Sequence, residues 1–325
     1  MTPSRVKHLL NNLLAGTWPI FIWGPPGVGK SSLVKEIGLE RELPVIDVRA
    51  PLLDPTDIRG VPSVIDGQAV WSPPSFLPRE GTGILFFDEL NTAPPLVQAS
   101  LYQLTLDRAV GEYTLPIGWR IIAAGNRAKD ASIVHRMPAA LSNRFIHLDF
   151  EVSVDDWRGW AIKSNIHPLI TGFIGTRPEL LFDMRNPERG FPTPRSWHML
   201  SDAISHFQDF KSALDLLIGI VGEGAALEFH GYISNALNEE SIRKIVDNPE
   251  TETLPTSISD QYALISYLAY HADNAAIRKA SGIILLRLDP ELGVLLARDM
   301  IRANPKFSIE KTYLAFAAKH HEFIQ

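Results

Sequence analysis

The chain has 325 residues and no cysteine, which excludes disulfides, thiol catalysis and thiolate metal sites. Hydrophobic residues make up 45% of the chain and charged residues 21%, a balance that indicates a globular protein of about two domains and excludes a disordered or fibrous one. The net charge of −6 comes entirely from residues 151–325, because basic and acidic side chains are equal in number before them. This mild acidity excludes a basic protein that coats nucleic acid or membranes.

The sequence contains no run of about 18 apolar residues, so no membrane insertion is predicted. The N-terminal segment Val6–Asn12 mixes polar with apolar residues and lacks the apolar core of a signal peptide. From these two absences we expect a cytoplasmic protein.

In chain order, the first 150 residues alternate between helical patterns and short apolar runs. Helices are expected over residues 5–16 and about 30–40, and strands over 18–23, 45–48, 84–87, 120–123 and 145–148. Such alternation predicts a three-layer α/β domain with a parallel five-stranded sheet. The dipeptide Asp66-Gly67 favours a β-hairpin over residues 61–71, and residues 109–116 could form a second one.

After residue 150 helical patterns dominate. Asp155 and Asp156 are expected to cap the first of these helices. The polar, acidic stretch 238–258 is predicted to be a linker or an exposed loop. Four further helices are expected, starting near Ser257, Asp273, Asp289 and Ser308.

The strongest motif follows the first predicted strand and fits the phosphate-binding pattern G-x-x-x-x-G-K-[ST] at each fixed position. Its glycines let backbone N–H groups curl around phosphate oxygens, and the following helix adds its positive N-terminal end. Lys30 would reach the β- and γ-phosphates, and the Ser31 hydroxyl would bind Mg²⁺. The residues expected to bind nucleotide are Gly24, Pro25, Pro26, Gly27, Val28, Gly29, Lys30, Ser31 and Ser32.

Two further strand ends carry polar side chains. The strand at 84–87 delivers Asp88 and Glu89 to its carboxyl end, where ligands bind in open α/β sheets. Asp88 would hold Mg²⁺ and Glu89 would position the attacking water. Asn126 follows the strand at 120–123 and could contact the γ-phosphate or orient that water, although asparagine after Gly125 is also common in turns.

Together these stretches resemble an AAA+ ATPase, and their detailed sequence motifs resemble those of the MoxR family within this group. The resemblance covers about residues 5–210. It is carried by the stretches Gly24–Ser31, Asp54–Gly60, Asp88–Pro95, Ala124–Asn126 and Pro138–Phe145.

The resemblance implies roles for single residues. Asn126 corresponds to sensor 1, Arg144 to an arginine finger that acts on the ATP of a neighbouring subunit, and Arg195 to sensor 2. Arg136 and Arg127 are alternative candidates for the role of Arg144. Asn91 could modulate the catalytic activity of Glu89 or cap a helix. We therefore expect Glu89, Asn126, Arg144 and Arg195 to be catalytic, with Ser31 and Asp88 holding the metal.

For the whole chain, the resemblance implies a nucleotide-binding domain at residues 1–150, a helical lid at 151–235 and an unmatched helical extension at 236–325. It implies an ATP-hydrolysing chaperone that uses ATP and Mg²⁺ and forms a ring homo-oligomer, expected to be a hexamer. The expected partners are a protein with a von Willebrand factor A domain and a protein client. The two hairpins would face the pore of the ring or the client.

Two other functions stay open. A DNA-acting AAA+ motor is a weaker interpretation. The first 150 residues carry no net charge, whereas a protein that moves along the phosphate backbone of nucleic acid needs positive charge. Nucleic acid is therefore not the expected partner. A nucleotide-gated scaffold with little turnover is disfavoured by the intact set of Asp88, Glu89, Asn126, Arg144 and Arg195.

Overall fold

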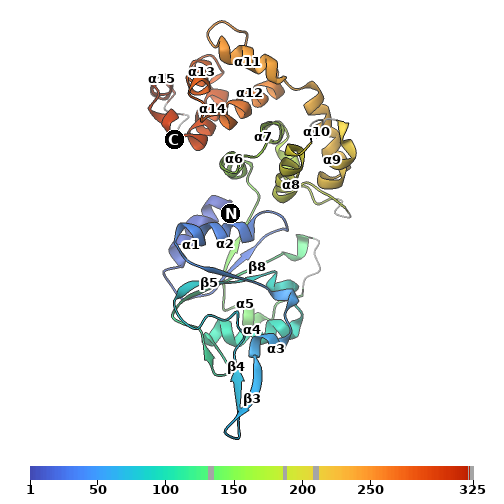
Figure 1. Cartoon of the computed structure of the whole chain (residues 1–325), viewed down its shortest axis with the longest axis vertical. Helices are drawn as coiled ribbons and strands as arrows, with labels where there is room; N and C mark the ends of the chain where they lie inside the picture. Colours follow the sequence, from blue (N-terminus) through green and yellow to red (C-terminus); the bar gives the residue numbers. More distant parts are fainter. Residues whose placement is uncertain (131–134, 186–188, 208–211, 321, 323–325) are drawn as a thin grey trace. The chain divides into compact units, whose positions relative to one another are not determined.

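The computed structural model describes residues 1–130, 135–185, 189–207, 212–320 and 322. It forms two compact units, Met1–Val152 and Ser153–Gln325, which are coloured from blue to green and from green to red in Figure 1. The division of the second unit at residue 235 remains a proposal.

The first unit is built on a parallel five-stranded sheet, as the sequence predicts. Its strand order is β2-β5-β8-β1-β9. Strand β1, which precedes the glycine-rich loop, therefore lies between β8 and β9, the last two strands of the unit in sequence. The first strand begins at Ile20 and leaves the Trp18 side chain 70% exposed. The strands are β1 (Ile20–Trp23), β2 (Val45–Arg49), β5 (Thr82–Asp88), β8 (Gly118–Gly125) and β9 (Ile146–Asp149).

Helices cover both faces of this sheet (Figure 1). Successive side chains of a strand point to opposite faces, and Phe21 and Leu85 lie in one core cluster with Leu101 of α4 and Leu141 of α5. The alternate positions Ile20 and Ile22 are also fully buried, which requires a second covering layer. The helices of this unit are α1 (Pro3–Leu13), α2 (Lys30–Glu40), α3 (Pro55–Arg59), α4 (Pro95–Asp107) and α5 (Ala139–Ser142).

Both predicted hairpins are present. Strands β3 (Val61–Ile65) and β4 (Gln68–Ser72) pair antiparallel, and their turn residues Asp66 and Gly67 have φ angles of 51° and 79°. Positive φ at both positions suits the twist of a two-residue hairpin. Strands β6 (Ala109–Val110) and β7 (Tyr113–Thr114) form the second, shorter hairpin.

The second unit is helical throughout its described residues. Its helix α12 packs against α7 and its helix α14 against α6. The helices are α6 (Val154–Lys163), α7 (Pro168–Thr176), α8 (Pro194–Ser205), α9 (Leu214–Val221), α10 (Glu223–Asn235), α11 (Glu239–Asp247), α12 (Ile258–Tyr270), α13 (Ala275–Leu285), α14 (Pro290–Ala303) and α15 (Lys311–Lys319). None of the helices in the described ranges has the length and apolarity needed to cross a bilayer.

Two expectations for this unit are wrong. The stretch 238–258 contains helix α11, which buries Ile242 and Ile245 and is capped by the Asn238 side chain. With two buried residues in nine, its apolar pattern is too sparse to stand out in the sequence. Helix α6 is capped by the Ser153 hydroxyl, and Asp155 lies within the first turn.

Candidate nucleotide-binding site

The phosphate-binding motif forms the connection between β1 and α2, in the order that the sequence predicts. Gly27 and Gly29 have φ angles of 75° and 102°, which side chains rarely adopt, so these two positions need glycine. Helix α2 starts at Lys30, and no side chain caps it. Its first amides have no partner within the helix and are available to phosphate oxygens.

Lys30 connects this loop to the predicted sensor residue. Its side chain is buried, and Nζ donates hydrogen bonds to the carbonyl oxygens of Gly24 (2.7 Å) and Pro25 (2.8 Å) and to Oδ1 of Asn126 (3.1 Å). Strand β8 brings Asn126 here because it is the direct neighbour of β1 in the sheet. The structure thus joins two candidates that lie 96 positions apart in the chain.

The two predicted metal ligands also meet. The Ser31 hydroxyl donates to Oδ2 of Asp88 over 2.6 Å, and the Asp88 side chain is 5% exposed. A hydroxyl beside a carboxylate offers the oxygen ligands that Mg²⁺ prefers, so the residues present fit the expected ion. Mg²⁺ held by Ser31 and Asp88 would supply positive charge next to the phosphates.

Arg49 is a neighbour of Asp88 that sequence reasoning missed. Its Nη1 lies 2.9 Å from Oδ2 of Asp88, and its Nε lies 3.8 Å from Oδ1 of Asp47. Arg49 ends β2 and is paired in register with Asp88 at the end of β5. A basic residue directly after the strand predicted at 45–48 was the available signal, but only the strand order places it beside Asp88.

Glu89 is exposed and stands where the chain turns sharply away from the sheet. Its φ and ψ angles are 57° and 35°, and its backbone N–H donates to Oδ1 of Asp88 over 3.0 Å. A left-handed conformation is unfavourable for a residue with a side chain, by about 1 kcal/mol. The turn separates the two adjacent carboxylates: Asp88 stays buried and Glu89 faces solvent.

Asn91 has a role that the sequence did not predict. Its Nδ2 donates to the backbone oxygen of Asn126 (2.6 Å), and its Oδ1 accepts from the backbone N–H of Asn126 (3.1 Å). A Cβ at position 125 would collide with Oδ1 of Asn91, so Gly125 leaves room for this pairing. The buried Asn91 therefore fixes the backbone of Asn126.

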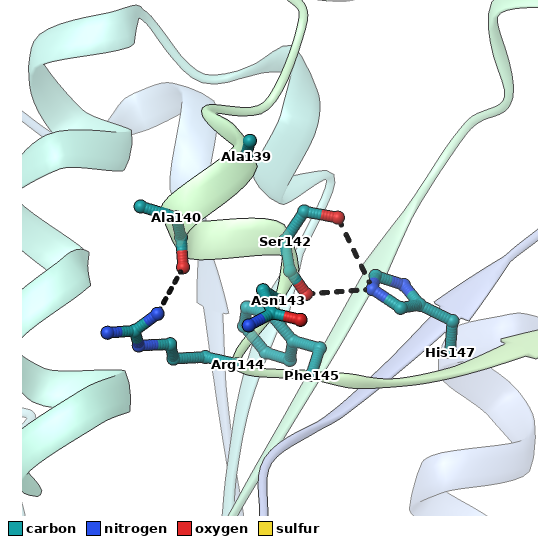
Figure 2. Close-up of a pocket in the computed structure, with 7 residues that line it drawn as sticks. All are labelled: Ala139, Ala140, Ser142, Asn143, Arg144, Phe145 and His147. Atoms are coloured by element: carbon teal, nitrogen blue, oxygen red, sulfur yellow. Dashed lines mark hydrogen bonds between the residues drawn. The ribbon is translucent and has the colours of Figure 1, made fainter.

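Arg144 follows helix α5 and lines a pocket of about 660 Å³ (Figure 2). Its Nη1 donates to the carbonyl oxygen of Ala140 (3.1 Å), and its guanidinium lies 5.2 Å from the ring centre of Tyr102 on α4. Its Nε is buried without a hydrogen-bond partner. Within the described ranges, no hydrogen bond joins Arg144 to the phosphate loop of its own chain. The pocket is lined by Ala139, Ala140, Ser142, Asn143, Arg144, Phe145 and His147.

The other arginine candidates differ in their surroundings. Arg127 is held in a local ion pair, with its Nε 3.0 Å from Oδ2 of Asp130, whereas Arg136 is exposed. Arg195 belongs to the second unit, where it lies exposed in the first turn of α8. The Thr193 hydroxyl caps that helix and the buried Trp197 anchors it. The roles of all three arginines remain predictions.

A comparison with solved structures gives matches of low sequence identity. NtrX from Brucella abortus is 15% identical, with 98% of this chain and 67% of that chain covered and a TM-score of 0.40. A variant of RuvB from Thermotoga maritima is 17% identical, with 82% of this chain and 81% of that chain covered and a TM-score of 0.43. A comparison with curated proteins gives no match.

Residues 19–145 match the model of the AAA domain, dynein-related subfamily. The matched segment begins just before β1 and ends just before β9, so it spans the phosphate loop, the acidic strand end and Asn126. The first unit of this chain therefore has the fold of an AAA+ P-loop NTPase, and its residues 19–145 are similar to AAA domains of the dynein-related subfamily.

Proposed function

We propose that the protein is an ATPase that uses Mg²⁺ and works as a ring homo-oligomer, expected to be a hexamer, to remodel a protein client. One observation carries the proposal. Lys30 and Ser31 of the phosphate loop are joined by hydrogen bonds to Asn126 and Asp88, respectively, which lie at the carboxyl ends of two other strands. Ligands of open α/β folds bind at the carboxyl ends of the strands.

The chemistry follows from these residues. The amides of the phosphate loop would bind the phosphates of ATP, and Lys30 would exchange its carbonyl partners for phosphate oxygens. The exposed carboxylate of Glu89 would position and polarise the attacking water, while Asn126 would orient the γ-phosphate or that water.

A second subunit would supply Arg144. A guanidinium near the transferring phosphoryl group stabilises its negative charge and raises the rate by about 10³–10⁵. AAA+ proteins commonly form rings, and a residue that serves a neighbouring site needs no contact with its own phosphate loop. Arg144 supports this expectation, because it follows α5 and donates its hydrogen bond to the carbonyl oxygen of Ala140 on that helix.

We further propose that the chaperone is of MoxR type and acts with a protein that carries a von Willebrand factor A domain. The motifs at residues 88–95 and 138–145 support this assignment by resemblance. The β3–β4 hairpin supports client contact, because Val61 and Val64 expose 70% and 78% of their surfaces on it. The lid role of residues 151–235 and the sensor role of Arg195 belong to the same proposal.

The substitution Glu89→Gln tests the function. It should preserve ATP binding and reduce hydrolysis at least 100-fold, because the amide cannot polarise water. A pull-down with this variant in ATP should retain the partner and the client. Hydrolysis at the wild-type rate would contradict the role of Glu89, and binding of DNA in place of protein would contradict the chaperone role.

A further inference from the structure

His147 forms a bridge between two segments that the proposed function assigns to different subunits' sites. It lies on β9, and its Nδ1 accepts a hydrogen bond from Nε1 of Trp23 over 2.7 Å. On its other side, Nε2 lies 2.8 Å from the carbonyl oxygen of Ser142 and 3.4 Å from the hydroxyl of the same residue. Figure 2 draws both contacts. One imidazole thus links the end of β1 to the end of α5.

The two partners fix the protonation state of the ring. An indole N–H can only donate, so Nδ1 carries no proton, and a carbonyl oxygen can only accept, so Nε2 carries one. His147 is therefore a neutral imidazole that accepts from Trp23 and donates to Ser142. A side chain that cannot both accept and donate at these positions breaks the bridge.

Each end of the bridge lies next to a residue of the proposed reaction. Trp23 is followed directly by Gly24, the first residue of the phosphate loop, and its ring stacks on Phe21 with a centroid distance of 4.1 Å. Ser142 is the last residue of α5 and precedes Arg144 by two positions. His147 is therefore a side-chain connection between the start of the phosphate loop and the segment that carries Arg144, in addition to the backbone pairing of β1 with β9.

We propose that His147 is a positioning residue that connects the phosphate loop of one subunit to the Arg144 that the same subunit offers to its neighbour. The inference rests on the proposed trans-acting role of Arg144. In this arrangement, nucleotide bound to one subunit sets the orientation of α5 and thereby the activity of the adjacent site. His147 does not contribute to hydrolysis at its own site.

Mixtures of two inactive full-length variants separate these roles. Arg144→Ala subunits keep an intact site and lack the arginine, whereas Glu89→Gln subunits keep the arginine and cannot hydrolyse. Neither variant should turn over ATP alone, but a mixture should regain activity wherever an Arg144→Ala site lies beside a Glu89→Gln subunit. Without this recovery, the trans-acting role of Arg144 is wrong and the inference about His147 falls with it.

The substitution His147→Ala is then introduced into only one of the two variant subunits of the mixture at a time. Added to the Glu89→Gln subunits, it should reduce the recovered kcat at least fivefold with no change in KM for ATP. Added to the Arg144→Ala subunits, it should leave the recovered activity within twofold. Equal losses in both mixtures, or no loss in either, would overturn the inference while leaving the role of Arg144 intact.

Two matched variants guard against a folding defect. Trp23→Phe keeps an aromatic ring beside Phe21 but removes the N–H donor, so in the Glu89→Gln subunits it should cause the same loss as His147→Ala. Ser142→Ala removes the longer hydroxyl contact with His147 (3.4 Å) but keeps the backbone carbonyl at 2.8 Å, so it should cause no loss. The inference is wrong if Ser142→Ala has the larger effect of the two.

Discussion

At the scale of single residues, the site depends on an asparagine that touches no expected ligand. Asn91 makes two hydrogen bonds to the backbone of Asn126, and both partners are buried. This pairing holds the Asn126 side chain near Lys30. The position of Asn126 is thus fixed by the hydrogen bonds of Asn91 to its backbone as well as by the contact of its side chain with Lys30 of the phosphate loop.

Substitution Asn91→Ala should therefore affect catalysis more than binding. It leaves a buried N–H and a buried C=O of Asn126 without partners, which should lower the free energy of unfolding by about 2–3 kcal/mol. We expect kcat to fall at least tenfold while Kd for ATP changes less than threefold. Urea unfolding, steady-state kinetics and nucleotide titration measure the three quantities, and a change in Kd alone would contradict this role.

The sequence predicts the residues of this site one by one but only part of their connections. The motif spacing identifies Lys30 and Ser31, and strand ends identify Asp88 and Asn126, because these signals lie within short segments. Asn91 and Arg49 could not be placed, since their contacts depend on which strands are neighbours. The order β2-β5-β8 is a property of the sheet and leaves no local trace in the sequence.

At the scale of elements, a buried ion pair ties together the helices of the second unit. Arg158 on α6 donates from Nη2 to Oδ2 of Asp299 on α14 (2.5 Å) and from Nη1 to the carbonyl oxygen of Thr171 on α7 (2.7 Å). The guanidinium also lies 5.6 Å from the ring centre of Tyr262 on α12. Both charged side chains are almost fully buried.

Breaking this pair should unfold the second unit more easily. Asp299→Ala leaves the Arg158 charge buried and unpaired, and we expect a loss of about 3–5 kcal/mol in the free energy of unfolding. Replacing both residues together, Arg158→Met with Asp299→Leu, should recover most of that loss. The neighbouring variant Arg298→Ala is the control: it removes only an exposed pair with Asp155 and should cost less than about 1 kcal/mol.

The start of α7 makes the second unit sensitive to acid. Burial lowers the pKa of His167 to about 4, and its Nδ1 accepts a hydrogen bond from the backbone N–H of Leu169. As pH falls from about 6.5 to 4, the unfolded chain binds a proton at this histidine before the folded chain does. The stability that the neutral ring contributes is present above pH 6.5 and is lost over this range, to a maximum of about 3 kcal/mol.

The variant His167→Asn isolates this effect, because asparagine keeps a capping oxygen and does not titrate. The wild-type protein should lose about 1–3 kcal/mol more stability than the variant between pH 7 and pH 4.5, as measured by urea unfolding. Parallel pH profiles of the two proteins would exclude His167 as the source.

Elements with strong local signals could be predicted, and those with mixed signals could not. The β3–β4 hairpin follows from Asp66-Gly67, whose positive φ angles are a local preference. Helix α11 was missed because its exposed face is highly charged, with the pairs Glu239–Arg243 and Glu240–Lys244, and only Ile242 and Ile245 are buried. Its partners in the core lie on later helices.

At the scale of the whole molecule, the proposed ring makes activity depend on assembly. If Arg144 completes the neighbouring site, a lone subunit lacks a catalytic group. ATPase activity per subunit should therefore rise at least tenfold across the concentration range in which size-exclusion chromatography with light scattering detects assembly. Arg144→Ala should assemble over the same range without this rise, and constant specific activity across it would contradict the trans-acting role.

The strand order of the first unit also has a consequence for its synthesis. Strand β1 pairs only with β8 and β9 in the sheet, and these strands emerge from the ribosome about 100 residues later. The nascent chain therefore holds an apolar segment of aromatic and branched residues that has no strand partner until β8 is complete at residue 125, and its other edge stays unpaired until β9 is complete at residue 149. Translation must deliver nearly the whole unit before the strand that carries the phosphate loop is protected from aggregation, so chains that end before β9 are expected to be insoluble.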